Sequence, residues 1–100
     1  MTIKFLMDKF KDTRNDTILS RDIVLTVKVA FVPEDPLNKY TILEDDTGSL
    51  DAVPTTRKIF ESLKLLQNSK LLKLKGRLDK TEFGNIAFAI EEILESPTIK

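Results

Sequence analysis

A chain of 100 residues has room for one domain of ordinary size. It has 16 basic and 16 acidic residues and a formal net charge of +0, so no overall positive charge attracts it to nucleic acid. The sequence lacks cysteine and histidine, which removes disulfides, thiolate metal sites and the usual general base. We therefore expect a non-catalytic, intracellular protein without metal, cofactor or membrane span.

Residues 1–17 are the least regular part of the chain and are treated as an N-terminal extension. Phe5, Leu6 and Phe10 are spaced to share one face of a short helix, whereas Ile3 and Phe5 fit an edge strand. The segment is too apolar for a free tail. We expect it to cover one end of the domain or to dock a partner.

Three strands are predicted next. Residues 18–32 alternate β-branched and apolar residues with polar ones, which indicates one long strand. Residues 39–44 and 49–53 form the second and third strands. The turn at 45–48 joins them in a hairpin, with Gly48 available for a positive φ.

A helix is predicted over residues 57–67, capped by Thr55 or Thr56, because apolar residues recur there at helical spacing. Residues 71–78 alternate again and form the fourth strand. Gly76 inside this strand indicates a bulge or a sharp bend.

A fifth strand at residues 85–95 completes the order β-β-β-α-β-β. This order predicts an all-β fold, a five-stranded Greek-key barrel of the OB type with one helix between strands 3 and 4. A long, bent first strand closes such a barrel by pairing at both its ends. The helix then plugs one open end of the barrel.

Two stretches of the sequence resemble a known family. Residues 40–52, YTILEDDTGSLDA, are similar to the second and third strands of the replication protein A class of OB-folds. Residues 72–78, LKLKGRL, and the segment after Gly84 are similar to its fourth and fifth strands. The resemblance covers residues 18–95 and leaves 96–100 as a C-terminal tail. It implies a protein that binds single-stranded DNA or RNA, or a small non-catalytic subunit of a replication, repair or telomere complex. Such a protein is expected to be nuclear in a eukaryote or cytoplasmic in a prokaryote.

Aromatic side chains that stack on bases are scarce, since the sequence has no tryptophan. Phe31, Phe60 and Phe88 fit predicted core positions. Tyr40 and Phe83 remain as stacking candidates, although the pattern does not decide whether Tyr40 faces outward. Phe83 lies in the loop between the last two strands, where OB-folds grip ligands.

The charge is unevenly distributed along the chain. Residues 54–80 carry eight basic and two acidic side chains, a net +6, between acidic segments on either side. Lys73, Lys75 and Arg77 are expected to form one stripe on a strand face. Arg57 and Lys58 lie in the first turn of the predicted helix, where the helix dipole disfavours cations, and a bound phosphate would offset this cost. The candidate phosphate-binding residues are Lys28, Lys39, Arg57, Lys58, Lys73, Lys75, Arg77 and Lys80.

These features lead to two functional hypotheses. The leading one is binding of single-stranded DNA or RNA, with the basic residues along the backbone and Tyr40 and Phe83 under the bases. The alternative is an OB-fold subunit that binds other proteins of a complex and does not contact nucleic acid. The basic segment favours the first, whereas zero net charge, two acidic segments and few aromatics favour the second. No small-molecule substrate is expected, and Asp45, Asp46 and Asp51 indicate an acidic hairpin rather than a cation site.

Overall fold

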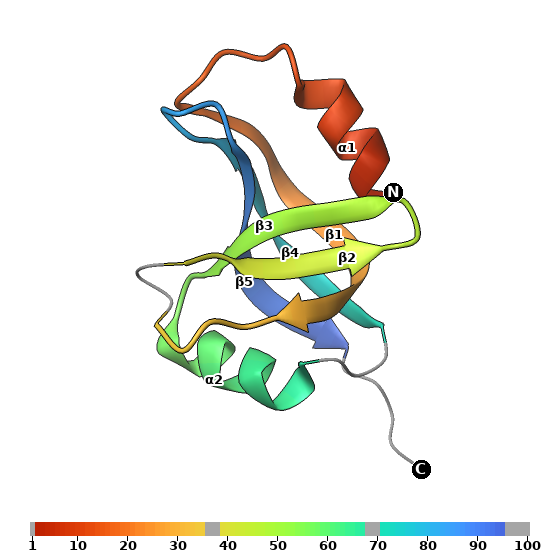
Figure 1. Cartoon of the computed structure of the whole chain (residues 1–100), viewed down its shortest axis with the longest axis vertical. Helices are drawn as coiled ribbons and strands as arrows, with labels where there is room; N and C mark the ends of the chain where they lie inside the picture. Colours follow the sequence, from red (N-terminus) through yellow and green to blue (C-terminus); the bar gives the residue numbers. More distant parts are fainter. Residues whose placement is uncertain (1, 36–38, 68–70, 96–100) are drawn as a thin grey trace.

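The computed structural model describes residues 2–35, 39–67 and 71–95, so the predicted tail at 96–100 lies outside the described residues. The elements are α1 (Ile3–Phe10), β1 (Thr17–Phe31), β2 (Thr41–Asp45), β3 (Gly48–Pro54), α2 (Arg57–Leu66), β4 (Leu72–Lys80) and β5 (Ile86–Glu95). The strands form a closed barrel in the order β1-β2-β3-β5-β4 (Figure 1). The prediction of a closed five-stranded barrel with a helix between the third and fourth strands is confirmed.

Strand β1 closes the barrel because it pairs with a different strand at each end. It is antiparallel to β4 from Thr17 to Val27 and antiparallel to β2 from Lys28 to Phe31. Its register with β4 shifts between Ser20 and Ile23, where Asp22 has a φ of 56°. Aspartate tolerates this left-handed conformation better than most residues. The irregularity thus falls where the long strand needs to bend between its two partners.

The predicted alternation of β1 holds from Ile23 to Val29 and then fails. The register with β2 shifts between Val29 and Phe31. This extra residue reverses the direction of the following side chains. Phe31 is therefore 42% exposed and Val32 is buried instead. The prediction that Phe31 belongs to the core was wrong.

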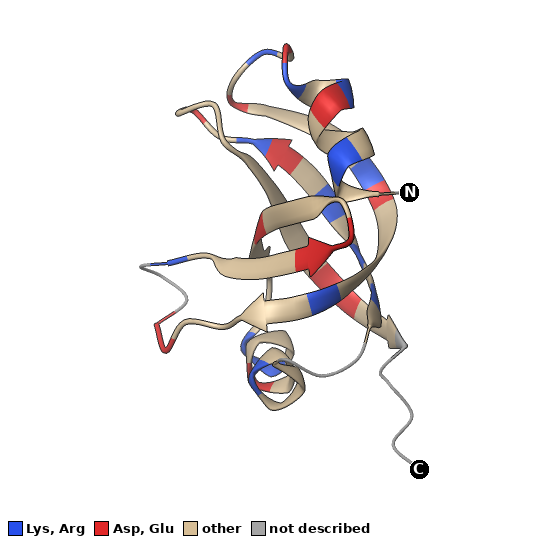
Figure 2. Ribbon diagram, turned by 45° about the vertical axis from the view of Figure 1, so that its right-hand side comes forward, with Lys and Arg blue, Asp and Glu red and all other residues tan. Residues whose placement is uncertain are grey.

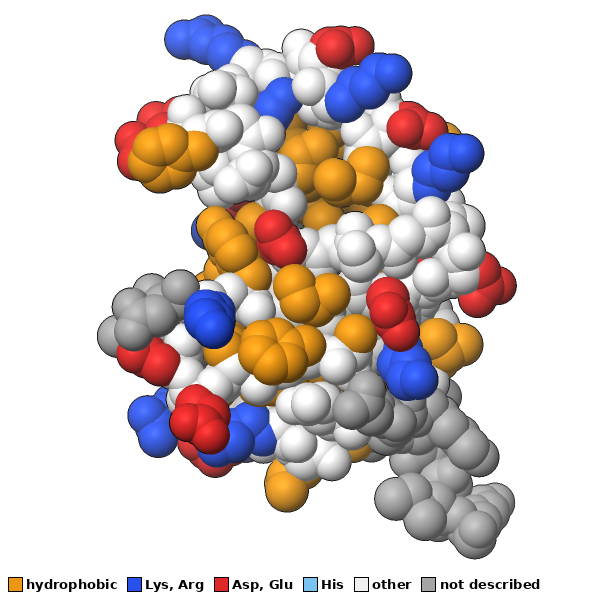
Figure 3. Space-filling view, viewed as in Figure 1, with side chains coloured by type: hydrophobic (Ala, Val, Ile, Leu, Met, Phe, Trp, Pro, Cys, Tyr) orange, Lys and Arg blue, Asp and Glu red, His pale blue; other side chains and the backbone are white. Residues whose placement is uncertain are grey.

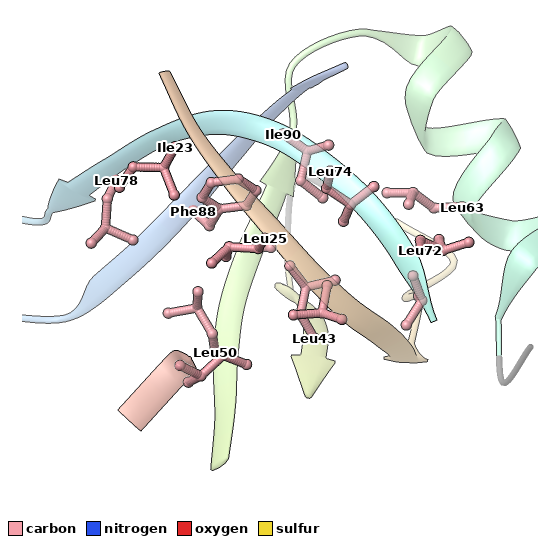
Figure 4. Packing of buried hydrophobic residues seen from close by; sticks show 14 of the residues in the cluster. Ile23, Leu25, Leu43, Leu50, Leu63, Leu72, Leu74, Leu78, Phe88 and Ile90 are labelled. Carbon is pink, nitrogen blue, oxygen red and sulfur yellow. The ribbon is translucent and has the colours of Figure 1, made fainter. Parts of the chain in front are cut away.

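The inward-facing side chains of the strands fill the barrel, with Phe88 fully buried among them (Figure 4). Helix α2 closes one end of the barrel with Ile59, Phe60 and Leu63. Its predicted cap is confirmed at Thr56, whose side-chain oxygen accepts the Ile59 N–H at 3.2 Å.

Two glycines behave differently from each other. At Gly76 the register between β4 and β5 shifts, as predicted, and a Cβ there would lie 2.0 Å from the Ala89 carbonyl oxygen. Only glycine permits this approach of the two strands. The prediction of a positive φ at Gly48 was wrong, because in the described chain the glycine with that conformation is Gly84, at 86°.

Helix α1 covers the end of the barrel opposite α2 (Figure 1). The helical alternative for residues 3–10 is therefore the observed one. Ile3 and Leu6 join the hydrophobic core and are each 1% exposed, whereas Phe5 is 53% exposed. Met7 and Phe10 are partly buried against this core, so the apolar character of the segment reflects packing on the barrel and leaves Phe5 on the surface.

Both ends of α1 are held by residues distant in sequence. At its start, Oδ2 of Asp45 accepts the Ile3 N–H at 2.9 Å. At its end, Nζ of Lys80 donates to the carbonyl oxygens of Lys11 at 2.7 Å and Thr13 at 2.6 Å. An acid at the N-terminus and a base at the C-terminus both match the helix dipole. Charged groups therefore hold α1 in place in addition to its apolar contacts.

The burial of α1 predicts its contribution to stability. We expect Leu6→Ala to lower the free energy of unfolding by about 2–5 kcal/mol, because it leaves a cavity between helix and barrel. Phe5→Ala, in the same helix but on its exposed side, is the control and should cost less than about 1 kcal/mol. Urea unfolding of the two variants measures both values. Equal losses would contradict the packing of α1 described here.

Candidate functional site

The predicted basic stripe does lie on the outer face of β4, but acidic side chains accompany it. Lys73, Lys75 and Arg77 alternate with buried residues, as predicted. The Arg77 Nε donates to both carboxylate oxygens of Asp79 at 3.0 Å, and Lys75 Nζ lies 3.7 Å from Oδ1 of Asp22. Basic and acidic segments are interspersed along the strands in Figure 2. Nearby carboxylates thus offset the repulsion expected within the stripe.

Lys80 does not belong to this stripe. It has the same parity along β4 as Leu72 and Leu78, and it is 7% exposed. Its ammonium group bonds to the carbonyl oxygens at the end of α1. The prediction that Lys80 lines a groove for phosphates therefore needs correction, since the side chain holds α1. The alternation of β4 could have shown this from the sequence, because it places Lys80 on the inner face and Asp79 on the outer face with Arg77.

Arg57 and Lys58 occupy the first turn of α2, as predicted, and both are exposed. The Nε of Arg57 lies 3.4 Å from Oε1 of Glu61, one turn along the helix. The Ile59 N–H, which has no partner within the helix, donates to the hydroxyl oxygen of the N-cap Thr56. The start of α2 is therefore a capped helix with an exposed ion pair.

The direction of the β2 side chains is now decided. Thr41 and Leu43 point into the barrel and are buried, so Ile42 lies on the outer face. Tyr40, which precedes β2, is half-buried. The sequence left open whether Tyr40 and Ile42 or Thr41 and Leu43 face the core. The structure places Thr41 and Leu43 inside.

An apolar surface results on the outer side of β1, β2 and β3. Phe31 pairs in register with Ile42, and Val53 is 36% exposed on β3. We call these three residues the apolar face. Orange side chains gather over β2 and the end of β1 in Figure 3. Phe31 is the residue of this surface that strand alternation did not place on the outside.

Charges of both signs surround the apolar face. Lys28 is opposite Glu44 in the register of β1 and β2, and Asp51 is opposite Ile42. Lys39 is exposed beside the face. A hollow of about 350 Å³ extends from Phe31, and its lining residues are Phe31, Pro33, Glu34, Asp35 and Lys39. The predicted residues Lys28 and Lys39 are thus close to the apolar face, but without a surplus of positive charge.

Phe83 is the most exposed aromatic side chain of the described residues, at 82%. It lies in the turn between β4 and β5, where Thr81 N–H donates to the Asn85 carbonyl at 2.8 Å. Asn15 Nδ2 donates to the carbonyl of Glu82 from the segment after α1. This turn projects on the same side of the barrel as the described ends of the β1–β2 connection (Figure 1). Phe83 is thus exposed in the β4–β5 turn, and Tyr40 is half-buried just before β2.

The acidic hairpin has a structural role. Asp45 accepts hydrogen bonds from the Thr47 hydroxyl and N–H and from the Ile3 N–H. Although desolvation opposes the shift, these hydrogen bonds and that of Gly48 N–H lower the pKa of Asp45 below its ordinary value. Within the described ranges, no group of three His, Cys, Asp or Glu side chains is placed to hold a metal ion.

Comparison with known proteins adds no relative: no family model and no curated protein matches the chain. Among the described helices, none is long and apolar enough to cross a membrane. Inference about function therefore starts from the surfaces described above.

The hydrogen bonds of Asp45 predict a pH dependence. Because its pKa is lower in the folded state, its carboxylate stabilises the fold at pH values above the ordinary aspartate pKa, and this contribution is lost as the pH falls through the lowered value. We expect Asp45→Asn to cost about 1 kcal/mol at pH 7, because the amide keeps one acceptor oxygen where the carboxylate uses two. The difference from the parent should shrink below pH 4 or so. Urea unfolding at several pH values measures it, with Asp46→Asn as the control; a cost independent of pH would contradict this account.

Proposed function

We propose that this chain is a non-catalytic protein-interaction barrel, a subunit that binds another protein of a complex through the outer side of β1, β2 and β3. The observation that carries the proposal is the apolar face, where Phe31 and Val53 remain exposed on the outer side of the sheet. Exposed apolar side chains gathered on one sheet face mark protein-binding surfaces. Their removal from water is the main source of affinity in such contacts.

The positions of the basic side chains also favour a protein partner over nucleic acid. Affinity for single-stranded nucleic acid depends on cations that neutralise phosphates. Of the predicted set, Lys80 is buried, Arg77 is bound to Asp79 and Lys75 is close to Asp22. The apolar face itself is bordered by acids as well as lysines. A protein partner with mixed charges fits this border better than a polyanion does.

Single-stranded DNA or RNA is the second candidate, and a specific observation favours it. Phe83 is almost free of contacts with the barrel, and Tyr40 lies beside the exposed Lys39. Aromatic side chains with neighbouring cations are what base stacking on OB-folds requires. Phe31, exposed on the apolar face, is a third aromatic side chain.

A substitution on the apolar face tests the proposal. We expect Phe31→Glu to reduce the amount of partner retained from an extract of the source cells at least tenfold, because it places a charge in the centre of the contact. Leu65→Glu is the matched control, since Leu65 is exposed on α2. Quantitative mass spectrometry of the retained proteins, with nuclease added, measures the difference.

Equal retention by the two variants would contradict the proposed surface. Retention that disappears when nuclease is added would instead support the second candidate, because the contact would then depend on a nucleic acid.

A further inference from the structure

A second hollow, of about 500 Å³, lies between α1, β3 and the β4–β5 turn. It opens on the face drawn in Figure 3, with apolar side chains at its floor. Met7 from α1 and Ile86 from β5 contribute apolar lining. Asp8, Ser49, Asp51 and Asn85 contribute polar lining. A volume of this size accommodates a large side chain or a small ligand.

Among the described residues, the carboxylates that line this hollow have no partner. In the part of the chain that the structure describes, neither Asp8 nor Asp51 makes a side-chain hydrogen bond or an ion pair, in contrast to Asp45 and Asp79, which are engaged. The hydroxyl of Ser49 is equally free. Hydrogen-bonding groups from α1 and β3, which are distant in sequence, thus border one hollow without hydrogen-bonding partners among the described residues.

The cations at the hollow do not compensate these carboxylates fully. Lys80 lines it, but its ammonium group is bonded to the carbonyl oxygens of Lys11 and Thr13 at the negative end of α1. The side chain of Lys11 is exposed at the rim. The formal charges of the two carboxylates and the two lysines therefore balance, but Lys80 already donates to backbone carbonyls, so the groups left for a ligand are mainly hydrogen-bond acceptors.

We propose that this hollow binds an arginine side chain of the partner protein, an inference that rests on the proposed function. A guanidinium group offers five donors in a plane and pairs with carboxylates in a bidentate manner. It is weakly hydrated and packs on apolar surface, as Met7 and Ile86 provide. A lysine ammonium, strongly hydrated and without a flat surface, gains less from an apolar floor.

The hollow adjoins the apolar face at Asp51. Asp51 and Val53 leave the same side of β3, about 6.6–7 Å apart, and Asp51 is opposite Ile42 in register. An extended partner segment that places an apolar side chain on Ile42 or Val53 therefore reaches the hollow within about two or three residues. The partner is expected to present an apolar residue and an arginine at that spacing.

The test is a ¹H–¹⁵N NMR titration of the full chain with N-acetyl-arginine amide, N-acetyl-lysine amide and the neutral N-acetyl-citrulline amide. We expect saturable shifts at Ser49, Asp51 and Asn85 with arginine, at least fivefold tighter than with lysine and absent with citrulline. Asp51→Asn should weaken arginine binding at least fivefold. Asp46→Asn, on the exposed hairpin turn, is the matched control and should bind as the parent does.

Equal responses to the three probes, or unchanged arginine binding by Asp51→Asn, would overturn the inference. If partner retention still depends on Phe31 in that case, the proposed function stands and only the arginine site is lost. If arginine binds as expected but retention is independent of Phe31, the proposed function is the part that fails.

Discussion

The structure depends on the double pairing of β1. A single strand of 15 residues lies against β4 with its first part and against β2 with its last, so the five strands close on themselves. Closure satisfies strand edges that would otherwise recruit other chains. It also forces irregularities into β1, at Asp22 and after Val29. The second of these turns Phe31 to the outside, so the apolar face is a direct consequence of how the barrel closes.

The ends of the barrel follow from the same closure. Each open end of a small barrel exposes core side chains, and here each end carries a helix. Helix α2 is held by its apolar residues and its threonine cap. Helix α1 has only Ile3 and Leu6 fully buried, and charged groups at both termini supplement them. Lys80, which the sequence offers as a ligand-binding group, is thus used to hold the fold.

Strand alternation predicts the barrel and the inward faces of β1, β4 and β5, because burial on one side imposes a period of two. It does not predict bulges, since an extra residue depends on the partner strand, and Phe31 was misplaced for this reason. For β2 both residue sets are plausible core, and the choice of Leu43 depends on its neighbours Val29 and Leu50 across the sheet. The contact of Asp45 with Ile3 joins residues 42 positions apart, which no local pattern reveals.

Within the predicted basic set, Arg77 pairs with Asp79 and Lys80 is bonded to the end of α1. We propose that the outer side of β1, β2 and β3 therefore binds a protein rather than single-stranded nucleic acid. A fluorescence titration with labelled single-stranded DNA and RNA at two salt concentrations tests this most directly. The account predicts no saturable binding at micromolar protein, even at low salt. Saturable binding whose logarithm falls with the logarithm of salt concentration, with a slope of about −3, would indicate that about four phosphates are neutralised and would contradict the account.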